Sequence, residues 1–313
     1  MLPSSPRRSP QDIPNLRGRT AVVTGATSGL GHVMARVLAE RGAHVVLAVR
    51  DLARGRAASA ELVGDTEARQ LDLGDLASVR SFAAALAADH HRVDLLVNNA
   101  GVGFAGAPPT VEGFEGALGV NHLGHFVLTG LLMPVLERGS GSRVLTVASD
   151  FARYGRLDPD RLDTHLSPAR AYARSKLANV LFGAELDRLL RDGGSRVRSV
   201  LAHPGMTRTP IHGRVTSVVA RLAFATPAQL FGRSVEEGAR PLLHAAVGPE
   251  PEPDVMTGPG AGRRPPSATP LTGRLADSEL AARLWAASEH LTGVSYPRAV
   301  AAPDGGAGRR DDR

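Results

Sequence analysis

The chain has 313 residues, of which 42% are hydrophobic and 22% charged, so it is long enough to bury a sizeable core. It contains no cysteine, which excludes disulfide bonds, thiolate metal ligands and a cysteine nucleophile. No apolar run approaches the ~20 residues that span a bilayer, and no apolar stretch follows the arginines near the N-terminus. The sequence therefore predicts a cytoplasmic protein without a membrane span.

The formal net charge of +6 is concentrated in two segments. Residues 1–20 carry four arginines against one aspartate, and residues 261–275 carry three arginines and no acidic residue. The rest of the chain is close to neutral and has no basic stripe with interleaved aromatic residues. Because nucleic-acid-binding surfaces have such stripes, nucleic acid is not an expected partner.

Strands and helices alternate along the chain after an arm at residues 1–16, whose Pro, Ser and Arg content predicts disorder. Apolar runs predict strands at 21–24, 44–49, 70–73, 94–98, 143–149 and 197–202. Helical periodicity predicts helices at 32–41, 76–89, 112–137, 168–191, 236–247 and 277–293. Continuous apolar strands alternating with helices indicate an α/β fold, a parallel sheet covered on both faces. We expect one doubly wound domain of about seven strands over residues 17–300.

The later part of the chain departs from this alternation. Residues 206–235 mix apolar and basic side chains with two prolines and are predicted to form a lid. Residues 248–273 are rich in Pro and Gly and are expected to be mostly loop. The C-terminal extension ends in a predicted disordered tail at residues 301–313.

A glycine-rich turn follows the first predicted strand, with the sequence Thr24-Gly25-Ala26-Thr27-Ser28-Gly29-Leu30-Gly31. Between a strand and a helix, such glycines let the backbone approach a pyrophosphate bound at the helix N-terminus. The turn predicts a dinucleotide site, and an ordinary strand–helix turn is the alternative.

The end of the second predicted strand distinguishes between dinucleotides. Val49 stands where NAD-binding proteins carry an acidic residue, and Arg50 follows it. A guanidinium suits a 2′-phosphate, so NADP(H) is preferred over NAD(H). Asp51 could pair with Arg50, which leaves this preference open.

The chain has 37 basic residues, and Lys176 is the single lysine among them. Lysine offers a compact ammonium whose pKa can shift, which arginine cannot imitate. Lys176 follows Tyr172 by four residues in a predicted helix, so both side chains lie on one face. The pair is predicted to serve one site.

Together these motifs resemble the short-chain dehydrogenase/reductase family over residues 17–300. The resemblance rests on the glycine turn, Asp72-Leu73, Asn98-Asn99-Ala100-Gly101, Asn121, Ser149, Tyr172-x-x-x-Lys176 and His203-Pro204-Gly205. Residues 175–182 and 284–293 are similar to the branch of retinol dehydrogenases and WW-domain oxidoreductases, although no WW module is present. The resemblance implies a Rossmann-like fold and a nicotinamide cofactor.

By analogy with the family, Asp72 would reach the adenine of the cofactor, and residues 98–101 would border the adenine ribose. The loop after His203 would hold the nicotinamide carboxamide. The cofactor contacts implied are Gly25, Thr27, Ser28, Gly29, Leu30, Gly31, Arg50, Asp72, Leu73, Asn98, Ala100, Gly101, Tyr172, Lys176, Pro204, Gly205, Thr207 and Thr209.

The resemblance also implies four catalytic residues. Tyr172 would exchange a proton with the substrate oxygen, and the Lys176 ammonium would lower the tyrosine pKa and hold the nicotinamide ribose. Ser149 would orient the substrate oxygen, and Asn121 would hold a water that links Lys176 to solvent. Tyr172 follows Ser149 by 23 residues, a long gap that the branch explains by an insertion, here residues 153–166. Ser167 is the less favoured substitute for Ser149.

These inferences predict an NADP(H)-dependent oxidoreductase that interconverts a carbonyl and an alcohol of a fairly apolar small molecule. The apolarity is inferred from lid residues Ile211, Val215, Val218, Val219, Leu222, Phe224, Leu230 and Phe231. One alternative is a cofactor-binding sensor or scaffold without turnover, and another is a sugar-nucleotide epimerase, which Asn121 and the glycine spacing fit poorly.

His122 and His203 are expected to be structural, and the eleven histidines show no metal-ligand spacing, so no metal is expected. The helices carrying Asn121 and Tyr172 could form a homodimer or homotetramer.

Overall fold

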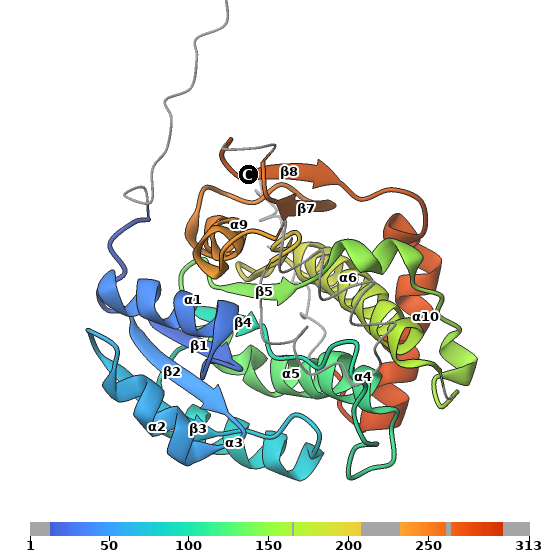
Figure 1. The fold of residues 1–313 in the computed structure, drawn as a ribbon, viewed down its shortest axis with the longest axis horizontal. Coiled ribbons are helices and arrows are strands. Elements are labelled where there is room, and N and C mark those ends of the chain that lie inside the picture. Colours follow the sequence, from blue (N-terminus) through green and yellow to red (C-terminus); the bar gives the residue numbers. More distant parts are fainter. Residues whose placement is uncertain (1–12, 165, 208–231, 261–263, 297–313) are drawn as a thin grey trace, which may run out of the picture.

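The computed structural model describes residues 13–164, 166–207, 232–260 and 264–296. Within these ranges one eight-stranded sheet runs through the molecule in the order β3-β2-β1-β4-β5-β6-β7-β8 (Figure 1). All neighbouring strands are parallel except the last pair, β7 and β8, which is antiparallel. The strands are β1 (Thr20–Thr24), β2 (His44–Val49), β3 (Thr66–Gln70), β4 (Leu95–Asn98), β5 (Arg143–Val147), β6 (Arg198–Ala202), β7 (Val255–Gly258) and β8 (Ser267–Pro270).

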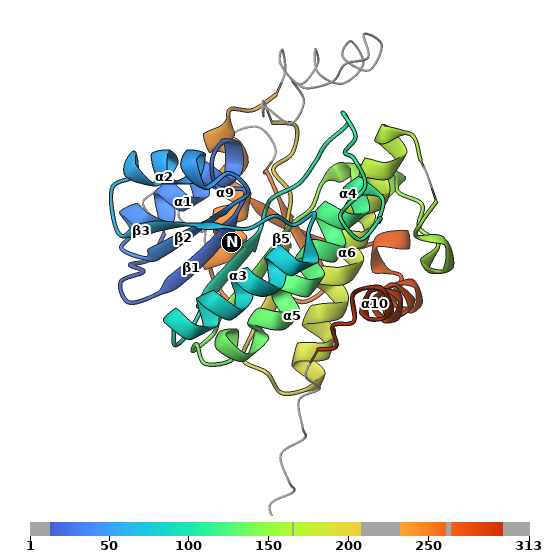
Figure 2. The same cartoon turned by 90° about the horizontal axis from the view of Figure 1, so that it is seen from below.

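Helices cover both faces of the sheet (Figure 2). One face packs against α1 (Gly29–Glu40), α2 (Leu52–Ala60) and α9 (Val235–Val247). The other packs against α3 (Leu76–Asp89), α5 (Gly124–Leu136) and α6 (Pro168–Asp192), and α10 (Ser278–Thr292) lies outside α6. Short helical turns are α4 (Gly116–Leu118), a π turn η2 (Gly119–Leu123), and 3-10 turns η3 (Asp150–Tyr154), η4 (Pro159–Arg161) and η7 (Gly273–Ala276).

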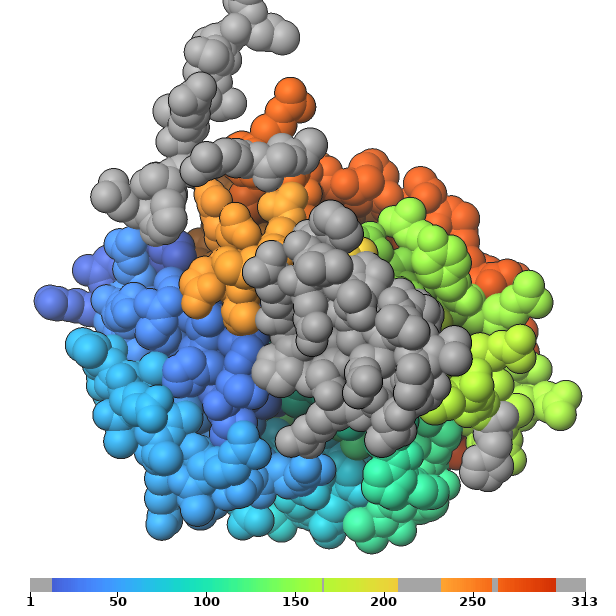
Figure 3. Space-filling model, viewed as in Figure 1, coloured from blue at the N-terminus to red at the C-terminus, as the bar shows by residue number. Residues whose placement is uncertain are grey.

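The apolar strands form two cores because successive side chains of a strand point to opposite faces. In β1, Val22 belongs to the core under α3 and α5, whereas Ala21 and Val23 belong to the core under α1 and α9. On the molecular surface in Figure 3, the N-terminal segments in blue lie at one side and the β7–β8 region in orange lies at another edge. The strand order reverses between β1 and β4, and ligands of such sheets bind at the carboxyl ends beside this point.

The predicted doubly wound α/β fold is confirmed, with three corrections. The sheet has eight strands instead of about seven, because β7 and β8 form in the segment predicted to be mostly loop. The third strand lies at Thr66–Gln70 instead of 70–73, since this half-buried edge strand carries polar residues and lacks an apolar run. Helix α2 was not predicted, because it buries only Gly55 and Ala58 and has no apolar stripe.

The helix predicted at 112–137 is divided into α4, the π turn and α5. The segment Gly116–Leu136 is the one candidate among the described residues that is long and apolar enough to cross a membrane, by length and composition alone. In this structure 83% of its most apolar window is buried inside the protein, as a core helix against the sheet.

Several predicted segments fall outside the described residues. These are residues 1–12 of the arm, the tail at 301–313, and residues 208–231 of the lid, which include Thr209 and all the apolar lid residues. Leu16, which was assigned to the arm, is buried in the core under α1.

Candidate active site

A cavity of ≈510 Å³ lies at the carboxyl ends of the central strands. The glycine turn after β1 lines one part of it, and Ser149, Tyr172 and Lys176 line another. Residues from the ends of β2, β4, β5 and β6 complete the wall. The topology therefore brings together predicted site residues that lie up to 182 positions apart, from Gly25 to Thr207.

The glycine turn has no room for side chains at two positions. A Cβ on Gly25, whose φ is +68°, would lie 2.9 Å from Ala100 Cα. A Cβ on Gly31 would lie 2.5 Å from both Asn99 Nδ2 and Gly25 O. Between them, Thr27, Ser28, Gly29 and Leu30 line the cavity at the N-terminus of α1. The turn thus fits the approach of a phosphate to bare backbone amides and a helix N-terminus.

Thr24, the last residue of β1, fixes the turn that follows β4. Its Oγ1 accepts hydrogen bonds from Asn99 N and Ala100 N, both at 2.9 Å. Asn99 Nδ2 donates to Thr24 O at 2.8 Å. Asn99, Ala100 and Gly101 line the cavity, so Asn99 joins the site although the sequence did not single it out as a contact.

Two predicted cofactor contacts do not line the cavity. Asn98 is buried at the end of β4, where its Nδ2 donates to Thr129 Oγ1 at 3.0 Å. Asp72 Oδ1 accepts a hydrogen bond from Gly74 N at 2.9 Å, so this carboxylate is used in the turn before α3. The neighbouring Leu71 and Leu73 line the cavity instead.

Two arginines line the cavity near the end of β2: Arg50 directly follows the strand, and Arg54 lies in the first turn of α2. Asp51, the potential partner of Arg50, is the N-cap of α2, and its Oδ1 accepts a hydrogen bond from Arg54 N at 3.0 Å. Among the described residues no acidic side chain forms an ion pair with Arg50. Its guanidinium is exposed at the cavity wall and is available to an anion.

Three of the four predicted catalytic residues, Ser149, Tyr172 and Lys176, converge on one region of the cavity. Ser149 is the N-cap of η3 after β5, and Tyr172 and Lys176 lie on successive turns of α6. Lys176 Nζ lies 5.9 Å from the centre of the Tyr172 ring and donates a hydrogen bond to Val147 O at 3.0 Å. Tyr172 and Lys176 are almost fully buried, at 7% and 5% exposure, so water contributes little to their solvation.

Burial changes the pKa of both groups. It lowers the pKa of Lys176 to about 8, because desolvation disfavours the ammonium. It raises the pKa of Tyr172, and a hydrogen bond with the Ser149 side chain opposes this only in part. Burial thus has the largest effect on the tyrosine pKa in this structure, and the lowering of this pKa by Lys176 stays a prediction.

Asn121 lies in the π turn and does not line the cavity. Its Nδ2 donates to Val102 O at 3.0 Å and to Ser175 Oγ at 2.9 Å, while its Oδ1 accepts from Val102 N at 2.7 Å. The side chain thus joins the loop after β4 to the helix that carries Tyr172 and Lys176. Its predicted role in holding a water stays a prediction.

The loop after β6 reaches the cavity through Pro204, Gly205, Met206 and Thr207. His203, just before it, faces Asp150 across the ends of β5 and β6, with Nδ1 3.2 Å from Oδ2. The hydrogen bond from His203 holds the pKa of Asp150 below its usual value. Asp150 lines the cavity beside Ser149 and was missed in the sequence, because only the fold brings it to His203.

Aromatic side chains form a wall beside Tyr172. The Phe104 ring lies 4.5 Å from the Tyr172 ring and 4.9 Å from the Phe151 ring, centre to centre. Both phenylalanines line the cavity. Only 4% of the chain is aromatic, so the sequence alone did not reveal this cluster.

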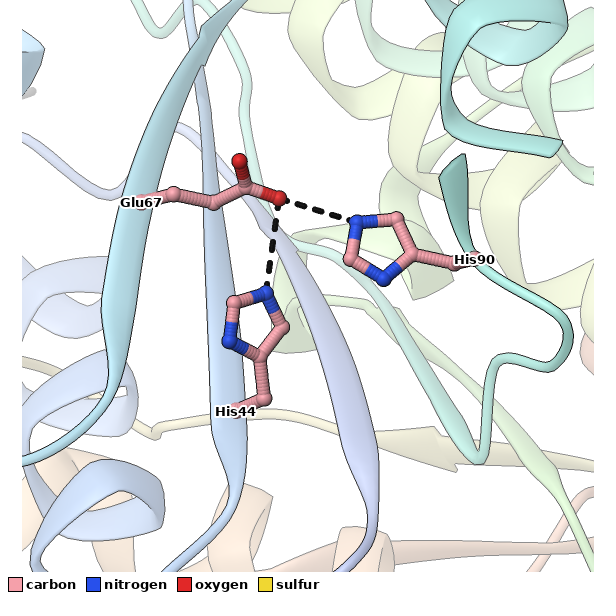
Figure 4. A group of neighbouring side chains, drawn as sticks. All are labelled: His44, Glu67 and His90. Atoms are coloured by element: carbon pink, nitrogen blue, oxygen red, sulfur yellow. Dashed lines mark hydrogen bonds and ion pairs between the residues drawn. The ribbon is translucent and has the colours of Figure 1, made fainter. Parts of the chain in front are cut away.

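A second polar cluster, His44, Glu67 and His90, lies at the amino-terminal ends of β2 and β3 and the end of α3 (Figure 4). Glu67 Oε1 lies 2.9 Å from His90 Nε2 and 3.4 Å from His44 Nε2. These residue types could bind a metal ion, and their distance in sequence hid them from a search by spacing. However, Arg69 Nε donates to the same Glu67 oxygen at 3.0 Å, and its Nη2 lies 3.2 Å from His90 Nε2. The guanidinium already neutralises the carboxylate, so this geometry favours an ion-pair network.

Comparisons with known proteins agree with this geometry. A family model described as short chain dehydrogenase matches residues 19–219. The chain is 38% identical to human retinol dehydrogenase 13 over 292 residues, which covers 90% of this chain and 86% of that protein. It is 43% identical to mouse polyprenol dehydrogenase over 302 residues, with 91% and 87% covered.

Solved structures show the same fold. A crystal structure of an uncharacterised protein from Mycobacterium paratuberculosis has a TM-score of 0.78 at 41% identity and covers 93% of this chain and 100% of that one. Another, described as an NAD(P)-dependent gluconate 5-dehydrogenase from Beutenbergia cavernae with bound NADP, has a TM-score of 0.58 at 30% identity. It covers 75% of this chain and 91% of that chain.

Proposed function

Because this chain belongs to the short-chain dehydrogenase/reductase family and is an oxidoreductase of that family, we propose that it uses NADP(H) to interconvert a carbonyl and an alcohol. The substrate is a fairly apolar small molecule. The observation that carries the proposal is one cavity that joins a dinucleotide-type glycine turn to Ser149, Tyr172 and Lys176. A nicotinamide cofactor fits there, because bare backbone amides, a helix N-terminus and an exposed guanidinium face the cavity.

The cofactor supplies the hydride, and the residues of this chain manage the proton and the substrate oxygen. Ser149 donates a hydrogen bond to the carbonyl oxygen, and Tyr172 donates the proton that this oxygen gains on reduction. Burial raises the pKa of Tyr172, so the phenol retains the proton that reduction of a carbonyl requires. The Lys176 ammonium provides positive charge beside the phenolate that remains after proton donation.

The aromatic wall supports an apolar substrate. Phe104 and Phe151 border the space beside Tyr172 and offer no hydrogen bonds to a polar substrate. The names of the relatives, retinol dehydrogenase and polyprenol dehydrogenase, also point to apolar alcohols. We therefore expect oxidation of NADPH with retinal, a short polyprenal or an aryl aldehyde, and none with a sugar acid ketone such as 5-ketogluconate. NADPH oxidation with the sugar acid alone would overturn the apolar assignment.

Replacing Arg50 by alanine is expected to weaken NADPH binding by about 10- to 100-fold, the equivalent of losing a charge-assisted hydrogen bond of about 1.5–3 kcal/mol. The dissociation constant of NADH should change less than about threefold, because NADH lacks the 2′-phosphate. Nicotinamide fluorescence titration measures both constants.

Arg56→Ala is the matched control for this experiment. Arg56 is an exposed arginine of α2, and it does not line the cavity. If Arg50→Ala and Arg56→Ala have the same effect, or if wild-type protein binds NADH as tightly as NADPH, the assignment of Arg50 to the 2′-phosphate is wrong.

The cytoplasmic location and the homodimer or homotetramer expected from the sequence stay predictions. Sedimentation of the purified protein at several concentrations measures the oligomeric state directly.

A further inference from the structure

His125 is a buried histidine of α5, with 2% exposure, whose ring bonds two parts of the site. Its Nδ1 lies 3.1 Å from Asn121 O. A carbonyl oxygen can only accept, so Nδ1 carries the hydrogen. Its Nε2 lies 3.0 Å from Thr24 Oγ1. Burial, with the nearby Lys176 charge, lowers the pKa of His125 to about 4 against the opposing effect of the Asn121 bond, so the ring is neutral and Nε2 accepts.

Thr24 connects this ring to the turn after β4. Its Oγ1 already accepts from Asn99 N and Ala100 N, so its hydroxyl hydrogen is shared between Val97 O at 3.1 Å and His125 Nε2. The imidazole of His125 therefore lies between Thr24, which fixes the turn after β4 at the cavity, and the backbone carbonyl of Asn121.

The other end of this connection is the π turn. Gly124 N donates to Gly119 O, five residues earlier, which widens the helix over Gly119–Leu123. The His125 ring supplies an additional donor to the Asn121 carbonyl within this widened turn. The Asn121 side chain in turn holds Val102 and Ser175, next to Lys176 on α6.

We propose that His125 is a positioning residue, whose Nδ1–H bond to Asn121 O holds the π turn open and keeps Asn121 and α6 in register with the cofactor side of the cavity. This inference rests on the proposed function, in which Tyr172 and Lys176 act from α6.

Two substitutions separate the two bonds of the ring. In His125→Asn, the amide nitrogen lies at the same distance along the side chain as Nδ1 and can donate to Asn121 O. In His125→Gln, the amide reaches the place of Nε2, so the contact to Thr24 can remain while the Asn121 bond is lost. His125→Phe removes both bonds.

His122 provides the matched control. It is 1% exposed, lies in the same π turn, and contacts Ser288 Oγ through Nε2 at 2.9 Å, with the Phe126 and Phe182 rings nearby. Among the described residues it forms no hydrogen bond with Asn121, Thr24 or Lys176. His122→Phe should therefore reduce stability without a specific effect on kcat.

The test measures kcat, the NADPH dissociation constant and thermal stability of all four variants, with the wild type's best carbonyl substrate. We expect His125→Gln and His125→Phe to lose about 10- to 100-fold in kcat, as for a misplaced catalytic group, while His125→Asn and His122→Phe stay within about threefold. NADPH binding should stay within about threefold in each variant. A uniform loss across the three His125 variants that only follows stability would overturn the inference.

Crystal structures of the His125→Asn and His125→Gln variants show whether the His125 ring holds the π turn, and this readout does not depend on turnover. The π turn should persist in His125→Asn and close to a regular α-helix in His125→Gln. An unchanged π turn in both variants contradicts the inference. A wild-type protein that binds NADPH but reduces no carbonyl contradicts the proposed function instead, and these structures still show whether His125 holds the turn.

Discussion

Replacing Tyr172 by phenylalanine is expected to lower kcat for carbonyl reduction by about 10²- to 10⁴-fold, the usual contribution of a positioned general acid. The substitution removes the phenolic proton but keeps the ring that packs against Phe104 at 4.5 Å. NADPH should bind with a dissociation constant within about threefold of the wild type, since the glycine turn and Arg50 are unchanged. The decrease in NADPH absorbance measures turnover, and fluorescence titration measures binding.

Tyr154→Phe is the control for this substitution. Tyr154 is 72% exposed on η3 and does not line the cavity, although its ring lies 6.1 Å from that of Phe151. Its hydroxyl should be dispensable for turnover. Tyr172→Phe activity above a tenth of the wild type would exclude Tyr172 as the acid. Bound NADPH without turnover in the wild type would instead favour a sensor or scaffold.

Replacing Lys176 by methionine is expected to abolish detectable turnover and at the same time to stabilise the folded protein by about 1–3 kcal/mol at pH 7. Replacing buried charged groups by well-packed apolar ones often has this effect. The Lys176 side chain is 5% exposed, and among the described residues its ammonium has one hydrogen bond, to Val147 O. Burying the Lys176 ammonium therefore lowers the stability of the folded protein, a cost that is accepted because the reaction needs this lysine.

The stability gain of Lys176→Met should depend on pH in a defined direction. The pKa of Lys176 is about 8 in the folded protein, against an ordinary value of 10.5. The unfolded chain thus binds more protons between these values, so wild-type stability from this group rises with pH across that window. The advantage of the variant should be complete below pH 8 and should shrink toward pH 10.5. Melting temperatures of both proteins between pH 6 and 10 test this. A destabilised variant, or a stability gain that does not change with pH, would refute the burial of the Lys176 ammonium as the cause.

The sequence by itself determined the fold class, and it identified the glycine turn and the Tyr172–Lys176 pair that line the cavity. Apolar strands such as β2 and the helical stripe of α6 follow from local periodicity, which reflects burial on one or both faces of an element. The glycine turn was recognisable because a tight turn before a helix needs residues without Cβ. The spacing of Tyr172 and Lys176 was recognisable because four residues make about one helical turn.

Only the tertiary structure decided which side chains come into contact, which of them remain available to a ligand, and in which direction each pKa shifts. Asp51 caps α2, which leaves Arg50 available, whereas Asn98 and Asp72 are used inside the fold. The contact between Asp150 and His203 joins the ends of β5 and β6, and the contact between His125 and Thr24 joins α5 to the end of β1. Such contacts have no local periodicity, because they arise where parallel strands end side by side. Likewise, the direction of the Tyr172 pKa depends on burial, which is set by everything packed around the ring and cannot be inferred from its distance to one lysine.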